Sequence, residues 1–139
     1  MNRVINLLFI IPSMEKGGAE RVLSMLLSNF SLDSKLCIHL LQLEKGLSYD
    51  LPLNVTRVVL SGSGKSEFRK FVDLPFQAWQ VSRYIKNHRI NTVMSFLYRA
   101  NYINILAKVL GVEYKAILNV RSTTSRYLSE GIRGKINLF

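Results

Sequence analysis

Two adjacent glycines, Gly17 and Gly18, stand between an apolar run and a helical pattern, where backbone amides can bind an anion. Val4 to Ile11 is apolar with almost no interruption, which is typical of a strand buried on both faces of a parallel sheet. Apolar residues then recur every three or four positions from Ala19 to Phe30, which predicts a helix. Because glycine tolerates positive φ and leaves room, we expect a sharp turn whose free helix amides face a phosphate.

Further segments of the chain predict the elements that would hold this turn in place. The predicted strands are Val4 to Ile11, Lys35 to Leu43, Val55 to Leu60, Thr92 to Leu97 and Tyr114 to Val120. The first predicted helix is Ala19 to Phe30. The second follows a loose segment within Glu67 to Arg89, with Asp73 as its cap and Pro75 in its first turn. The third is Asn101 to Leu110, ended by Gly111. Strands that alternate with helices predict an α/β fold, a Rossmann-like parallel sheet with helices on both faces.

Composition restricts the class of protein. A chain of 139 residues with 48% hydrophobic content fits one domain with a core, and its net charge of +10 favours an anionic partner unless the charge only keeps the domain soluble. Cys37 is the single cysteine, so the sequence contains no disulfide framework and no zinc spacing, which suits a reducing cytosol. No apolar stretch reaches the roughly 20 residues of a membrane-spanning helix, so membrane contact would be peripheral.

Two other candidates for chemistry are weaker. The segment Ser61 to Ser66 looks like the end of a phosphate-binding P-loop, but Val59 stands where that motif needs its first glycine. We interpret it as a flexible loop, in which Lys65 and nearby amides remain an alternative phosphate contact. His39 lies inside an apolar strand pattern and is interpreted as a core or edge residue, because the sequence shows no catalytic partner for it.

The stretch from Lys65 to Arg89 is both aromatic and basic, and it has two interpretations. Trp79 and the basic residues suit an anionic membrane surface or a lipid diphosphate. Alternatively, the aromatic side chains pack on the sheet while the basic side chains face water, because helical spacing is the same in both cases. The candidate membrane or lipid-phosphate contacts are Lys65, Arg69, Lys70, Trp79, Arg83 and Lys86.

Several motifs resemble family 4 glycosyltransferases. These are "IPSMEKGGAERV" after the first strand, and "SFL", two residues, "AN" and an apolar helix closing in "LG" further on. The resemblance implies the amino-terminal, acceptor-side half of a GT-B enzyme that transfers a sugar from a nucleotide sugar with retention and without a metal. It implies donor-phosphate or acceptor contacts at Gly17, Gly18, Glu20, Arg21, Ser95, Asn101, Arg121 and Ser122.

The segment after the fifth predicted strand departs from the family pattern. Family members commonly carry a serine, then histidine or arginine, then serine or asparagine, where this chain has Asn119, Arg121 and Ser122. The catalytic residue therefore stays undetermined, with Arg121 as the candidate, and its planar guanidinium suits phosphate oxygens.

The resemblance also implies what surrounds the chain. Ile132, Ile136 and Phe139 lie on one predicted helical face, and the sequence stops inside this element, so we expect a single domain over residues 1–139 without the donor-binding half. Alone it should not catalyse. The expected partners are a nucleotide sugar, a glycan or lipid-linked acceptor and an anionic membrane, at the cytoplasmic face of a bacterial cell membrane, with no cofactor, no metal and no nucleic acid. The rival interpretation is a non-catalytic basic α/β module that binds anionic lipid or nucleic acid.

Overall fold

The computed structural model describes residues 3–60 and 67–120, which form five strands and four helices within these ranges. The strands are β1 (Ile5–Ile11), β2 (Leu36–Gln42), β3 (Val55–Val59), β4 (Thr92–Phe96) and β5 (Lys115–Asn119). The helices are α1 (Gly18–Phe30), α2 (Glu67–Val72), α3 (Leu74–Asn87) and α4 (Tyr98–Val109).

The five strands form one parallel sheet in the order β3-β2-β1-β4-β5. From β1 the chain proceeds to β2 and β3 on one side and then returns to β4 on the other, so the winding reverses between β1 and β4. Open α/β sheets bind ligands outside the carboxyl ends of the strands at such a switch point. The predicted α/β fold is confirmed, and its topology favours a ligand site beyond the ends of β1 and β4.

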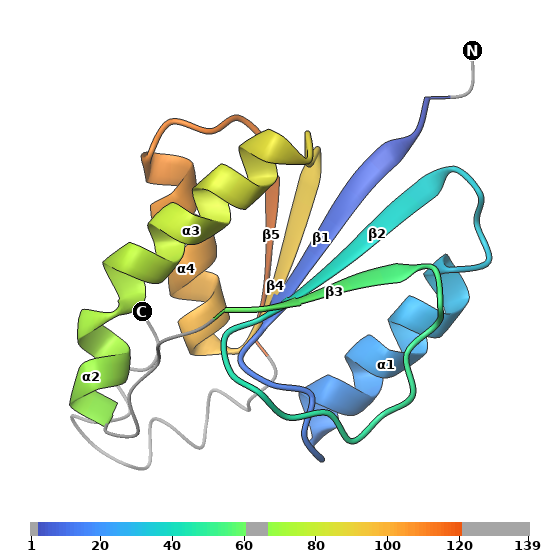
Figure 1. Ribbon diagram of the computed structural model, residues 1–139, viewed down its shortest axis with the longest axis horizontal. Coiled ribbons are helices and arrows are strands. Elements are labelled where there is room, and N and C mark those ends of the chain that lie inside the picture. Colours follow the sequence, from blue (N-terminus) through green and yellow to red (C-terminus); the bar gives the residue numbers. More distant parts are fainter. Residues whose placement is uncertain (1–2, 61–66, 121–139) are drawn as a thin grey trace.

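Helices cover both faces of the sheet, as predicted. Figure 1 shows α1 on one face and α3 and α4 on the other. The side chains of β1 alternate between two cores: Leu8 and Ile10 pack with α3 and α4, whereas Leu7, Phe9 and Ile11 pack with α1. The nearly uninterrupted apolar run of β1 is therefore explained by burial on both faces.

The structure differs from the prediction where α3 begins. The sequence predicts a loose segment followed by a cap at Asp73, but α2 occupies the supposedly loose part. Asp73 has helical dihedrals, φ −76° and ψ −11°, and its side chain makes no capping hydrogen bond. Its N–H donates to the carbonyl of Arg69, and its own carbonyl accepts from the N–H of Gln77, each at 2.9 Å. The nearly helical backbone at Asp73 thus satisfies these groups without a side-chain cap, while Pro75 does lie in the first turn of α3.

His39 is buried in β2, which confirms its interpretation as a core residue. Its Nδ1 lies 2.6 Å from the hydroxyl of Tyr84, and the ring of His88 lies 5.2 Å from the His39 ring. Burial lowers the pKa of His39, and the nearby charge of His88 lowers this pKa further. Both effects favour the neutral imidazole over the charged one.

Candidate functional site

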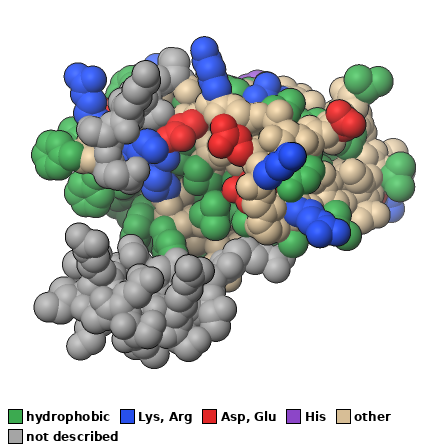
Figure 2. Space-filling view, turned by 90° about the horizontal axis from the view of Figure 1, so that it is seen from below, with side chains coloured by type: hydrophobic (Ala, Val, Ile, Leu, Met, Phe, Trp, Pro, Cys, Tyr) green, Lys and Arg blue, Asp and Glu red, His purple; other side chains and the backbone are tan. Residues whose placement is uncertain are grey.

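The site suggested by the topology lies where β1 and β4 end side by side. Ile10, near the end of β1, pairs in register with Ser95 of β4. The glycine turn follows β1 and the Ser95 segment leads into α4, so two of the predicted motifs meet at this edge. Figure 2 looks at the molecule from below Figure 1, the side on which the strands end, and shows acidic and basic side chains close together there.

Gly17 and Gly18 are exposed at the start of α1, and neither adopts the positive φ that glycine tolerates. Gly17 is extended, with φ −174° and ψ 170°, and Gly18 is the first residue of the helix. Among the described glycines, positive φ occurs at Gly46 and Gly111. A Cβ built on Gly18 would meet no heavy atom within 4 Å, so there is open space above this end of α1.

Glu20 places a carboxylate at the amino end of α1. A Cβ built on Gly17 would collide with this carboxylate, so the chain's own anion already lies close to the helix terminus. The carbonyl of Gly17 accepts hydrogen bonds from the N–H of Arg21 at 3.0 Å and from the hydroxyl of Tyr49 at 3.3 Å. Ligand contacts by Glu20 and by the exposed side chain of Arg21 stay predictions.

The loop before α1 is fixed by a neighbouring loop. Met14 is buried, its N–H donates to the carbonyl of Gly46 at 3.1 Å, and its carbonyl accepts from the N–H of Ser48 at 2.8 Å. Gly46 has φ 137°, and a Cβ there would lie 2.7 Å from Cγ of Glu15. The residue that must be glycine here is therefore Gly46, three positions after the predicted strand Lys35 to Leu43, and the sequence pattern does not single it out.

Ser95 and Asn101 belong to a buried polar network. The Ser95 hydroxyl donates to Oδ1 of Asn101 at 2.7 Å and accepts from Nδ2 of Asn104 at 3.0 Å. Nδ2 of Asn101 donates to the carbonyl of Asn119 at 3.1 Å. The network joins β4, α4 and β5 around Leu97, whose φ of 72° is uncommon for a residue other than glycine. In the structure these side chains position the turn after β4, and their contact with a substrate stays a prediction.

Glu44, just after β2, connects two cations from distant parts of the chain. Its Oε1 lies 2.7 Å from Nη1 of Arg99 in α4 and 3.2 Å from Nζ of Lys70 in α2. Burial alone would raise the pKa of Glu44, but the hydrogen bonds and charges of Arg99 and Lys70 outweigh it, so this pKa is lowered. The sequence pattern does not reveal Glu44 and Arg99, because residues 55 positions apart are brought together only by the fold.

The aromatic and basic stretch points outward. Arg69, Arg83 and Lys86 are exposed, and the guanidinium carbon of Arg83 lies 5.1 Å from the ring centroid of Trp79. The exposed apolar side chains of α2 and α3 are Phe68, Phe71, Val72, Phe76 and Trp79. The core-facing apolar residues of α3 are instead Leu74, Ala78, Val81 and Ile85. Of the aromatic side chains in this stretch, Tyr84 packs against the core, whereas Phe68, Phe71, Phe76 and Trp79 are exposed. Contact of the exposed group with a membrane stays a prediction.

Some predicted features lie outside the described residues, namely Lys65, Arg121, Ser122 and the helical pattern from Gly131 to Phe139. Across residues 3–60 and 67–120, no three His, Cys, Asp or Glu residues are grouped to hold a metal ion. In the same ranges no helix has the length and apolar character to cross a membrane.

Comparison with known proteins identifies the class. No protein-family model matches the chain. Over 131 residues, which are 93% of this chain, the sequence is 32% identical to N-acetylgalactosamine-N,N'-diacetylbacillosaminyl-diphospho-undecaprenol 4-alpha-N-acetylgalactosaminyltransferase from Campylobacter jejuni. The chain is homologous to part of a glycosyltransferase. This match confirms the glycosyltransferase resemblance of the motifs, and the chain spans 35% of the length of that enzyme.

Proposed function

We propose that the chain is the acceptor-side domain of a glycosyltransferase that adds a sugar from a nucleotide sugar to a glycan carried on a lipid diphosphate. The observation that carries this proposal is the 32% identity over 93% of the chain to an enzyme whose name specifies a diphospho-undecaprenol-linked saccharide and the transfer of N-acetylgalactosamine. The parallel sheet supports it, because its switch point offers a place for a ligand beyond β1 and β4.

In this proposal the turn at Gly17 and Gly18 faces the donor phosphates in the cleft between two domains. Open space over Gly18 and the amides in the first turn of α1 suit an approaching phosphate. The carboxylate of Glu20 must then move aside or accept a hydrogen bond from the sugar, because two anions repel each other at one helix terminus. A second Rossmann-like domain carries the nucleotide sugar, and transfer requires both domains.

The outward-facing aromatic stretch gives the domain its place at the membrane. Trp79 and Phe76 are 46% and 56% exposed and stack on each other, with Arg83 over the Trp79 ring. Amphipathic side chains of this kind lie at the headgroup level, while Arg and Lys attract anionic lipids. In the proposal the domain binds peripherally to the cytoplasmic face of the cell membrane, where a lipid-linked acceptor is presented, in cell-surface glycan assembly.

Binding measurements on the purified chain test the acceptor role. The ligands are a prenyl-diphospho-N-acetylgalactosamine, a panel of UDP-sugars, duplex DNA and phosphatidylglycerol vesicles, each followed by calorimetric titration. We expect the lipid-linked saccharide to bind and each UDP-sugar to bind more weakly, because the donor half lies in another domain. Binding of DNA or vesicles without any binding of the saccharide would instead support the non-catalytic basic module.

A further inference from the structure

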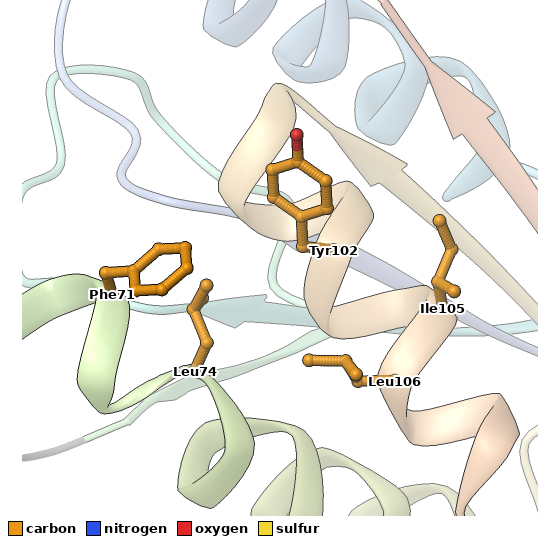
Figure 3. Close-up of a pocket in the computed structure, with 5 residues that line it drawn as sticks. All are labelled: Phe71, Leu74, Tyr102, Ile105 and Leu106. Atoms are coloured by element: carbon orange, nitrogen blue, oxygen red, sulfur yellow. The ribbon is translucent and has the colours of Figure 1, made fainter. Parts of the chain in front are cut away.

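An apolar cavity of about 410 Å³ opens between α2, the start of α3 and α4. Its lining is Phe71, Leu74, Tyr102, Ile105 and Leu106. Figure 3 shows that Phe71 and Leu74 project toward Tyr102 and Leu106 from the opposite helix. The volume lies within the range of small-molecule sites, roughly 300–1,000 Å³, and the lining offers a hydrocarbon many contacts but gives a nucleotide hardly any hydrogen-bond partners besides the Tyr102 hydroxyl.

The charged group around Glu44 adjoins this cavity. Lys70 directly precedes Phe71, and Arg99 lies three residues before Tyr102, on the same side of α4. Lys70 of α2 and Arg99 of α4 both contact the Glu44 carboxylate. Other residues of the same two helices line the apolar cavity. Lys70 and Arg99 do not line the cavity, but each is a near neighbour in sequence of a lining residue, so the two cations form a rim beside it, at the end where the strands of the sheet terminate.

Arg99 has hydrogen-bonding capacity that the described chain leaves unused. Its Nη1 donates to Glu44 at 2.7 Å, but Nε and Nη2 are enclosed and have no hydrogen-bond partner. The N–H groups of Nε and Nη2 lie on one edge of the planar guanidinium, the edge that binds two oxygens of a phosphate at once. Enclosed cationic N–H groups without partners are costly, so a movement of the covering side chains that admits an anion to this edge would be favoured.

We infer that the cavity holds the first isoprene units of a prenyl diphosphate while Arg99 binds the diphosphate, a site that rests on the proposed function and locates the lipid part of its acceptor. The apolar lining and cationic rim match the two halves of such a ligand. Glu44 orients the guanidinium by holding Nη1, which leaves the opposite edge for the phosphate oxygens. Arg99 is thus a binding residue, and Glu44 is a positioning residue that acts through it.

Calorimetric titration of the 139-residue chain with farnesyl diphosphate, inorganic diphosphate, farnesol and UDP tests this site. Farnesyl diphosphate should bind at least tenfold more tightly than inorganic diphosphate, because burial of its chain adds hydrophobic free energy. It should also bind more tightly than UDP, which carries the same diphosphate without a hydrocarbon. Equal affinities for farnesyl diphosphate, UDP and inorganic diphosphate would overturn the inference, because the cavity would then contribute nothing.

Three variants separate the cavity from its rim. Leu106→Trp fills the cavity. It should lower the affinity for farnesyl diphosphate at least tenfold without changing the affinity for inorganic diphosphate. Val109→Trp, on the same helix but outside the lining and 75% exposed, is the matched control and should leave both ligands unchanged. Arg99→Gln should weaken both diphosphates but not farnesol. Circular dichroism checks folding, and Ile105→Trp replaces Leu106→Trp if the latter unfolds.

The outcome also separates this inference from the proposed function. If the Leu106→Trp and Val109→Trp variants bind farnesyl diphosphate equally well, the prenyl chain does not use the cavity. If the Leu106→Trp variant also keeps full affinity for the prenyl-diphospho-saccharide, the proposed function stands without this site. If the unmodified chain binds no prenyl-diphospho-saccharide, the proposed function fails as well.

Discussion

Nη1 of Arg99 lies 2.7 Å from Oε1 of Glu44, which ties the first turn of α4 to the loop after β2. Both side chains are mostly enclosed, with exposed fractions of 22% for Arg99 and 28% for Glu44. The contact fixes the guanidinium beside the switch point of the sheet, where the proposed diphosphate would bind. Its contribution to the free energy of unfolding can be measured independently of any ligand.

Replacement of Glu44 by glutamine should lower the free energy of unfolding at pH 7 by about 1 kcal/mol, because a partly enclosed ion pair is lost. The pKa of Glu44 is lowered in the fold from its ordinary 4.5, so the stabilisation is present above pH 4.5 and is lost as pH falls through the folded-state pKa. Urea unfolding between pH 7 and pH 3 measures this. Glu113→Gln, at an exposed site, is the control, and equal effects of the two substitutions would show that the pair contributes no stability.

Replacement of Gly18 by valine should leave the melting temperature of the chain within a few degrees, because Gly18 has neither positive φ nor a neighbour that a Cβ would meet. In the complete enzyme, the same change should lower turnover about 100-fold, since the branched side chain occupies the space proposed for the donor phosphate.

Gly46→Val is the contrasting control. At φ 137° and next to Glu15, it should cost about 1–3 kcal/mol of stability. Full turnover by a folded Gly18→Val enzyme would mean that no donor phosphate binds in the space beside Gly18.

The fold was largely predictable because the apolar composition of β1 indicates a strand that is buried on both faces. Leu7 to Ile11 are all apolar, and alternate members of this run fill both cores. The site was less predictable, because the hydrogen bond from Arg99 to Glu44 joins residues 55 positions apart. A glycine pair also does not reveal its dihedral angles: neither Gly17 nor Gly18 has positive φ, whereas Gly46 and Leu97 do.

The aromatic stretch shows a second limit of sequence patterns. Helical spacing reveals which residues share a face, but not which face meets the sheet. Because Leu74, Ala78, Val81 and Ile85 also recur at helical spacing, the sheet takes the aliphatic face of α3 and leaves Phe76 and Trp79 outside.

Acidification should destabilise the chain through His39. Because its pKa is lowered in the fold, the unfolded chain binds the proton more readily, so stability is lost as pH falls below the ordinary value of 6.5. His39→Gln should flatten the decline of unfolding free energy below pH 6.5, and one proton accounts for at most about 1.4 kcal/mol per pH unit. His88→Gln should reduce the decline, since His88 lowers this pKa as well. An identical pH profile in the His39→Gln chain would contradict the assignment.

Charge reversal at Arg83 and Lys86 should weaken binding to anionic liposomes more than tenfold, because each basic residue near such a surface contributes about 1 kcal/mol and reversal also adds repulsion. Cosedimentation with phosphatidylglycerol vesicles measures the partition coefficient. The control reverses Lys35 and Lys115, which are exposed on other elements, so that the net charge changes equally. Equal losses in the two double variants would indicate a general charge effect, and equal binding of the unmodified chain to neutral and anionic vesicles would leave these residues as a solvated face.

Sugar transfer is the most direct test of the proposed function. The product of the complete reading frame that contains this chain and the purified 139-residue chain are each incubated with radiolabelled UDP-sugars and a prenyl-diphospho-N-acetylgalactosamine, and label in the lipid fraction is counted. We expect transfer by the complete product and none above background by the chain alone, because the proposed donor site lies in a second domain. Turnover by the 139-residue chain itself would contradict its assignment as the acceptor-side domain of a two-domain enzyme.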